Sequence, residues 1–267
     1  MKELTLPEIK EIELEILKVF HDFCQENNIR YFISHGTLLG TIRYKGFIPW
    51  DDDVDVLVPR EDYNRLLALF KDSERYQLFS FEKNEEFLFP YAKLCDMTTR
   101  KIENGMEDGL VVGLDMDIFP LDAWGSNLNQ AKKEVKHQKK AMFRLGLTKL
   151  DKADSVNPLK RFVKAILMAF CKMRGSKYYV RKIMKETARH PYEGSAYLGC
   201  KAWNVYGERD ILPAEVFDHP IEVEFEGHTF RAPVGYDAFL SSLYGNYLPE
   251  PPPEKRKTHH NFKAYKL

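Results

Sequence analysis

The stretch IPWDDDVDVLVP, residues 48–59, decides how this chain is interpreted. Four of its residues are aspartates, Asp51, Asp52, Asp53 and Asp55, and they lead directly into a valine-rich segment typical of a buried strand. A carboxylate beside an apolar core is costly unless a cation or a hydrogen-bond donor pairs with it. The stretch therefore predicts a strand whose acidic end binds a cation.

Alternate side chains of a strand share a face, so Asp53 and Asp55 point one way while the valines between and after them point into the core. Their Cα atoms are about 7 Å apart in an extended chain, close enough for both carboxylates to bind one hard cation. Residues 113–120, GLDMDIFP, repeat the pattern with Asp115 and Asp117. Two such pairs predict a Mg²⁺ clamp, and Mn²⁺ would suit the same oxygen ligands.

Two other interpretations of the aspartates are weaker. Clustered aspartates usually mark a solvated turn, but the surrounding valines and the second acidic pair argue against one here. A helix–loop–helix calcium loop fails as well. Counted from Asp51, its sixth position is Val56 rather than glycine, and its twelfth is Asp62 rather than glutamate.

A glycine-containing turn precedes the acidic strand. The segment SHGTLLGTIR, residues 34–43, places Gly36 and Thr37 where a predicted strand turns into a helix, and free backbone N–H groups at such a turn favour a phosphate. Arg43 and Lys45 follow closely. A phosphate-binding turn next to a metal clamp suits phosphoryl transfer, in which catalysis is mostly positioning and charge neutralisation.

The whole chain has the composition of a folded, soluble protein. It has 267 residues, 44% of them hydrophobic, and forty Lys+Arg balance forty Asp+Glu. Its four cysteines are widely spaced, which argues against a disulfide framework or a zinc site, and no window resembles a membrane-spanning helix. The first residues alternate charge with leucine and isoleucine, unlike a targeting signal. We expect a cytoplasmic protein.

Helical and strand patterns mix along the first part of the chain, which predicts an α/β (α+β) fold built on a mixed sheet. The clearest helices are 7–27 and 60–72, and residues 29–34 form a predicted strand. A β-hairpin is expected around Glu226-Gly227. The change in character along the chain predicts three units: a catalytic core over 1–126, a helical basic unit over 127–195, and a C-terminal segment over 196–267 that completes the site.

Residues 35–63, HGTLLGTIRYKGFIPWDDDVDVLVPREDY, resemble the LicD family, enzymes related to phosphorylcholine transfer and to the fukutin-related proteins. The resemblance continues in YAKLCDMTT (91–99), LDMDIFPLD (114–122) and SLYGNYLPEPPPEKRKTHH (242–260), whereas residues 127–195 match only loosely. It implies a nucleotidyltransferase-like fold. In that fold, a glycine followed by serine or threonine precedes two carboxylate residues on a strand, and a neighbouring strand carries a third carboxylate residue.

Carried over by position, that pattern implies roles for Gly36-Thr37, for Asp53 and Asp55, and for Asp117, with Asp115 as the rival third carboxylate. Thr37 occupies a position at which serine is commoner in the wider nucleotidyltransferase superfamily. Further candidates are Asp51 as an extra metal ligand and Asp52 as a structural residue. Arg43 and Lys93 are candidate phosphate contacts, and His259 and His260 could close over the nucleotide or act as acid and base. A mobile tail is the alternative for the two histidines, and a solvated lysine is the alternative for Lys93.

The resemblance implies Mg²⁺-dependent transfer of phosphorylcholine from CDP-choline to a sugar hydroxyl of a cell-surface glycan precursor, for example a lipid-linked teichoic acid precursor. Other interpretations are transfer of ribitol or glycerol phosphate from a CDP donor, nucleotidyl transfer, and a non-catalytic glycan- or partner-binding scaffold. A choline site needs aromatic faces. The sequence offers Trp50, Trp124, Trp203, Tyr206, Tyr244 and Tyr247 and does not choose among them.

The segment 155–185 contains nine Lys/Arg and no acidic residue. It predicts a basic helix for which three interpretations stay open: a core-packed helix with a solvated basic face, peripheral contact with an anionic membrane through 158–185, or nucleic-acid binding. No groove-reading motif accompanies the charge, so no nucleic-acid partner is expected. If the membrane interpretation holds, the protein would work at the inner face of the membrane.

Overall fold

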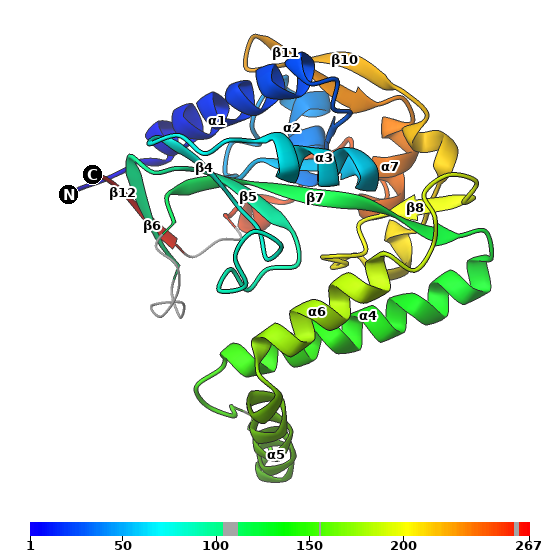
Figure 1. Ribbon diagram of the computed structural model, residues 1–267. Coiled ribbons are helices and arrows are strands. Elements are labelled where there is room, and N and C mark those ends of the chain that lie inside the picture. The colour runs from blue at the N-terminus through cyan, green and yellow to red at the C-terminus, as the bar shows by residue number, and fades with distance from the viewer. Residues whose placement is uncertain (104–111, 155, 259–261) are drawn as a thin grey trace.

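The computed structural model describes residues 1–103, 112–154, 156–258 and 262–267. At its centre lies a seven-stranded mixed sheet (Figure 1). Five strands lie side by side in the order β2 (Phe32–Ile33), β3 (Asp55–Pro59), β7 (Leu114–Gly125), β5 (Ala92–Asp96) and β4 (Tyr76–Phe79). β3 and β7 are parallel, and the other neighbouring pairs are antiparallel. The predicted α/β class with a mixed sheet is confirmed.

Shorter strands extend this framework. β8 (Tyr197–Gly199) pairs with the far end of β7, and β9 (Leu212–Pro213) pairs with β8. A second sheet joins the two ends of the chain, with β12 (Phe262–Lys266) between β1 (Lys2–Glu3) and β6 (Thr99–Glu103). The predicted hairpin is confirmed as β10 (Pro220–Phe225) and β11 (His228–Pro233).

The hairpin turn shows why it forms there. Glu226 and Gly227 have φ of 49° and 74°, so both central residues are left-handed. A two-residue turn of this kind matches the right-handed twist of the two strands that it connects. Glycine adopts such a φ without a steric cost.

Four helices accompany the sheets: α1 (Leu6–Glu26), α2 (His35–Tyr44), α3 (Arg60–Leu69) and α7 (Tyr236–Tyr244). The start of α1 is fixed by a capping box, because the backbone N–H of Thr5 donates to Glu8 Oε2 at 2.8 Å. Its buried stripe includes Ile16, Leu17 and Phe20, which belong to the main core. Three short 3₁₀ helices cover Gly207–Asp210, Ala214–Phe217 and Pro253–Lys255.

The expected helical region forms three helices, α4 (Leu128–Lys149), α5 (Pro158–Arg174) and α6 (Ser176–Thr187). In Figure 1, α4 and α6 lie together beneath the sheet and α5 extends farther away. These helices share a separate small core that includes Leu145, Cys171 and Tyr179. The limits of the three predicted units stay a prediction.

The strands near the acidic stretch are shorter than predicted. β2 covers only Phe32–Ile33, and β3 begins at Asp55, so Asp53 precedes the strand rather than lying within it. The physical reason is local. The backbone N–H of Asp55 donates to the side-chain oxygen of Thr37 instead of to a neighbouring strand.

Candidate active site

The N-terminal end of α2 faces the acidic stretch. A Cβ atom at Gly36 would lie 2.8 Å from Asp51 Oδ2 and 4.0 Å from Asp53 Oδ1. A side chain at position 36 would therefore displace the Asp51 carboxylate. Glycine allows this carboxylate to approach the helix end, where unpaired N–H groups and the helix dipole favour negative charge.

Thr37 positions Asp55. Its hydroxyl is buried and accepts the backbone N–H of Asp55 at 2.8 Å, while the N–H of Ser34 donates to the carbonyl of Asp55 at 3.0 Å. The backbone that carries the Asp55 carboxylate is thus held on both sides by the strand-to-helix turn. The predicted contact of the turn with a phosphate stays a prediction.

His35, at the start of α2, was missed by sequence reasoning. It has a φ of 45°, a left-handed conformation that costs about 1–3 kcal/mol in a non-glycine residue. Its ring stacks on Tyr206, with centroids 5.7 Å apart, and burial lowers its pKa to about 4. The imidazole is therefore neutral at pH 7 and lies 3.9 Å from Asp55 Oδ2. A histidine before Gly-Thr was the available signal.

Asp55 and Asp117 lie opposite each other on β3 and β7. The backbone N–H of Asp117 donates to the carbonyl of Val54 at 2.8 Å, which fixes this register. Burial raises the pKa of Asp55 well above its usual range, and the nearby carboxylates Asp53, Asp117 and Asp51 raise it further. A cation would relieve this repulsion.

The ligand set fits a hard divalent cation. Carboxylate oxygens of Asp51, Asp52 and Asp53 lie within 4.8 Å of one another. Asp52 Oδ2 also accepts a hydrogen bond from the Thr258 hydroxyl at 2.8 Å, so this residue ties the C-terminal segment to the acidic stretch. Oxygen-only ligands of this kind suit Mg²⁺ or Mn²⁺, and the assignment of Asp51 and Asp53 as metal ligands stays a prediction.

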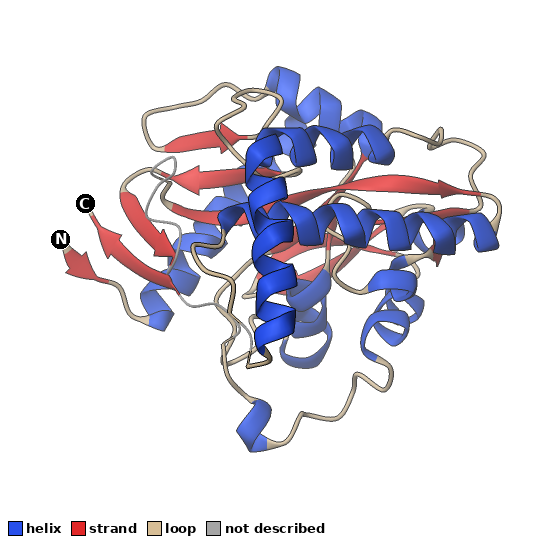
Figure 2. Cartoon of the chain, turned by 90° about the horizontal axis from the view of Figure 1, so that it is seen from below, coloured by secondary structure: helices blue, strands red, loops and turns tan. Residues whose placement is uncertain are grey.

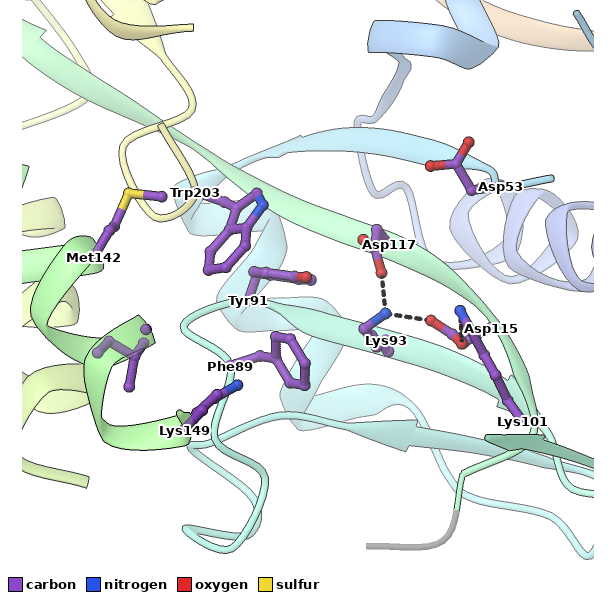
Figure 3. Close-up of a pocket in the computed structure, with 12 residues that line it drawn as sticks. Asp53, Phe89, Tyr91, Lys93, Lys101, Asp115, Asp117, Met142, Lys149 and Trp203 are labelled. Carbon is purple, nitrogen blue, oxygen red and sulfur yellow. Dashed lines mark hydrogen bonds and ion pairs between the residues drawn. The ribbon is translucent and has the colours of Figure 1, made fainter. Parts of the chain in front are cut away.

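Asp115 and Asp117 share a face of β7 but differ in their partners (Figure 3). Asp115 is 3% exposed; Lys93 contacts its Oδ2, and Lys101 Nζ lies 2.8 Å from its Oδ1. These two ammonium groups outweigh the effect of burial and hold the pKa of Asp115 below its usual range. Asp117 also pairs with Lys93, at 2.7 Å, but its side chain is 20% exposed. The geometry favours Asp117 over Asp115 as the third carboxylate.

Glu13 is an acidic residue that the sequence patterns did not single out. It lies on α1 with 0% exposure, and neither carboxylate oxygen has a hydrogen-bond partner among the described residues. Burial raises its pKa well above the usual range, with a further contribution from Asp53. A glutamate within the buried stripe of α1, four residues after Ile9, was the available signal.

A cavity of about 390 Å³ opens beside these carboxylates (Figure 3). One wall is charged: Asp53, Asp115, Asp117, Lys93 and Lys101. The other wall combines aromatic residues with the end of α4: Phe89, Tyr91, Trp203, Met142, Leu145, Gly146 and Lys149. The helical region and the segment after β8 therefore both contribute to the site. A volume of this size suits a small organic group with a phosphate.

The remaining candidates lie in different settings. Lys93 is buried rather than solvated, and its partners are carboxylates. Arg43 lies near the ring of Tyr44, with 5.5 Å from its guanidinium carbon to the ring centroid, and its buried Nη2 has no hydrogen-bond partner within the described chain. His259 and His260 lie outside the described residues. The phosphate contacts of Arg43 and Lys93 stay predictions, and so do the nucleotide or acid/base roles of His259 and His260.

Carboxylates on two adjacent parallel strands, beside the N-terminal end of a helix, form the arrangement that the resemblance to nucleotidyltransferase-like proteins implies. The family model LicD/FKTN/FKRP, nucleotidyltransferase domain, matches residues 28–152, which contain most of these side chains. The chain is also 32% identical to the lipopolysaccharide cholinephosphotransferase LicD of Haemophilus influenzae over the full length of both proteins. The chain belongs to the LicD family. A shorter match, 39% identity over 75 residues, links 27% of the chain to 24% of an uncharacterized Rickettsia typhi protein, RT0683.

Proposed function

We propose that this protein transfers phosphorylcholine from CDP-choline to a sugar hydroxyl of a glycan precursor. One observation carries the proposal. Asp53 and Asp117 line the same cavity as an aromatic wall, in a chain that aligns end to end with a cholinephosphotransferase. We further propose that the acceptor is a lipid-linked, teichoic-acid-like precursor and that the protein works on the cytoplasmic side of the membrane.

Asp51, Asp53, Asp55 and Asp117 would hold Mg²⁺ (or Mn²⁺), which neutralises the donor diphosphate when bound. Asp117 lines the cavity and its side chain is 20% exposed, so it would accept the proton of the acceptor hydroxyl. The hydroxyl oxygen forms a bond to the phosphorus that carries choline. The bond from this phosphorus to the CMP oxygen breaks, and CMP leaves with the electron pair.

The aromatic wall supports choline as the transferred group. Trp203 lines the cavity, with ring centroids 5.5 Å from Tyr91 and 6.4 Å from Phe89. Lys149 Nζ already lies 4.2 Å from the centroid of Phe89, so these faces accept a cation. Among the other aromatic candidates, Trp124 is fully buried and its indole N–H donates to the carbonyl of Asp210.

The test is a transfer assay with CDP-choline, CDP-ribitol and CDP-glycerol, each with Mg²⁺ and with EDTA. The release of CMP measures the reaction. Metal-dependent CMP release from CDP-choline in preference to the other donors supports the proposal. Preference for CDP-ribitol or CDP-glycerol would support the same type of reaction but with ribitol phosphate or glycerol phosphate as the transferred group. Binding without any turnover, across several glycan acceptors, would favour a non-catalytic scaffold.

A further inference from the structure

Helix α5 exposes a continuous apolar stripe. Six large side chains recur along the helix at positions i, i+3, i+4, i+7, i+11 and i+14, and their exposure is between 45% and 78%: Leu159, Phe162, Val163, Ile166, Phe170 and Met173. A helix of a soluble protein normally buries such a stripe against its own core. Figure 1 shows α5 at the outer end of the helical group, and it lies nearest the viewer in Figure 2.

The opposite side of α5 already attaches the helix to the protein. Met168 and Cys171 are buried there and belong to the small core formed with α4 and α6. The exposed stripe is therefore not needed to hold α5 in place. For α5 this contradicts the interpretation of a core-packed helix with only its basic face in solvent, since an apolar stripe of the helix is in solvent. In α6, by contrast, Tyr179, Val180 and Ile183 are buried in the small core.

The charged side chains of α5 itself are all basic, namely Lys160, Arg161, Lys164, Lys172 and Arg174, whereas Lys177 and Arg181 of α6 pair with Glu86 and Glu85. Residues 155–185 contain nine Lys/Arg and no acidic residue. Lys160 and Arg161 are exposed on the first turns of α5. At the other end, the guanidinium of Arg174 lies 4.0 Å from the ring centroid of Phe170, so a cation borders the apolar stripe directly. A partner for this face must bury the apolar stripe and must place negatively charged groups beside the Lys/Arg side chains.

We propose that α5 docks on an anionic lipid surface, with the stripe among the upper acyl chains and the Lys/Arg side chains at the headgroups. A second copy of this chain fits less well, because two faces bordered only by positive charge repel each other. None of the helices in the described ranges is long and apolar enough to span a bilayer. The proposal concerns contact with the surface alone and does not depend on the transfer reaction.

The test uses the full-length protein and sedimentation with two vesicle types, phosphatidylcholine alone and phosphatidylcholine mixed with phosphatidylglycerol. One variant removes the stripe (Phe162→Ser, Ile166→Ser, Met173→Ser), and a second reverses the charge (Lys160→Glu, Arg161→Glu, Lys164→Glu). A matched control places the same three reversals on exposed lysines elsewhere (Lys71→Glu, Lys133→Glu, Lys136→Glu). Melting temperature and light scattering are recorded for each protein.

We expect the intact protein to sediment with the anionic vesicles, less so as salt rises, because salt screens the headgroup attraction. Each α5 variant should lose about tenfold or more in its partition coefficient, with an unchanged melting temperature, while the control stays close to the intact protein. Absence of binding by the intact protein overturns the proposal, and so does an equal loss in the control. A dimer that the stripe variant splits, without vesicle binding, would assign this face to a second copy.

Discussion

Asp55 and Asp117 occupy directly opposed positions on the parallel strands β3 and β7, each two residues after another aspartate of the same acidic pattern. Parallel pairing places the two residues side by side on neighbouring strands, while Thr37 and the carbonyl of Val54 fix the two backbones. This arrangement supports the proposal that the two carboxylates share a cation. The strand register keeps the two Cα positions adjacent.

Substitutions of the two aspartates of β7 are expected to affect different properties of the protein, Asp117 its metal binding and turnover and Asp115 its stability. Asp117→Asn should lower Mg²⁺ affinity and reduce turnover by about a hundredfold or more, because it removes a ligand and the proton acceptor. Asp115→Asn should instead lower stability by about 3–5 kcal/mol, since Lys93 and Lys101 lose a buried partner. Calorimetric Mg²⁺ titration and urea unfolding separate the two effects. A loss of metal binding confined to Asp115→Asn would reverse the assignment.

Thr37 offers a test of backbone positioning. Thr37→Val keeps the shape but removes the acceptor of the Asp55 N–H, leaving a buried donor unsatisfied. We expect a loss of about 1–3 kcal/mol in unfolding free energy, together with weaker metal binding. Thr37→Ser keeps the hydroxyl and is the matched control, expected to restore both. If Val and Ser variants behaved alike, the hydroxyl would have no positioning role.

How much of this site could be predicted depends on how local its signals are. The two acidic pairs follow the period of a strand and Gly36-Thr37 marks a turn, so short segments were enough to find them. Trp203, only one of six aromatic candidates, and Lys101, which was not a candidate, reach the cavity through tertiary packing. Nothing in their neighbouring residues distinguishes them. The start of β3 was misplaced because a side-chain acceptor, Thr37, takes the N–H that an ordinary strand would share.

The same distinction applies to the fold. The hairpin at Glu226-Gly227 and helix α1 were predictable because turn chemistry and the periodic apolar stripe act within a few residues. Strand β12 was not, because its five residues pair with β6 and β1, which come from far earlier in the chain. For α5, periodicity revealed an apolar stripe, but only the packing of Met168 and Cys171 showed which side is covered.

Trp203 should determine the preference for choline. Removing its ring by Trp203→Leu is expected to raise KM for CDP-choline about tenfold, the order of a desolvated cation–π contact, and to leave KM for CDP-glycerol nearly unchanged. Trp203→Phe keeps an aromatic face and should retain most of the preference. Steady-state CMP release with both donors measures the ratio. An equal rise in both KM values would assign Trp203 to the nucleotide or to general packing instead.

Asp210 should make stability fall as pH rises. It is fully buried, its Oδ1 accepts the N–H of Cys200 at 3.3 Å, and its Oδ2 has no hydrogen-bond partner in the described ranges of the chain. Burial raises its pKa well above the ordinary 3.8. The folded protein therefore binds this proton more tightly than the unfolded chain. The stability it contributes is complete below the unfolded pKa and is lost as pH rises through the folded pKa.

Asp210→Asn preserves the shape of the side chain and removes the ionisation. We expect the variant and the intact protein to be similar in unfolding free energy near pH 4. Above that, the variant gains by up to about 1.4 kcal/mol for each pH unit until the folded pKa is reached. Urea unfolding at several pH values between about 4 and 8 measures the difference, and Asp151→Asn, at an exposed position, is the control. A difference that stays flat or shrinks with rising pH would mean that Asp210 is ionised in the folded protein, with a partner that stabilises its charge.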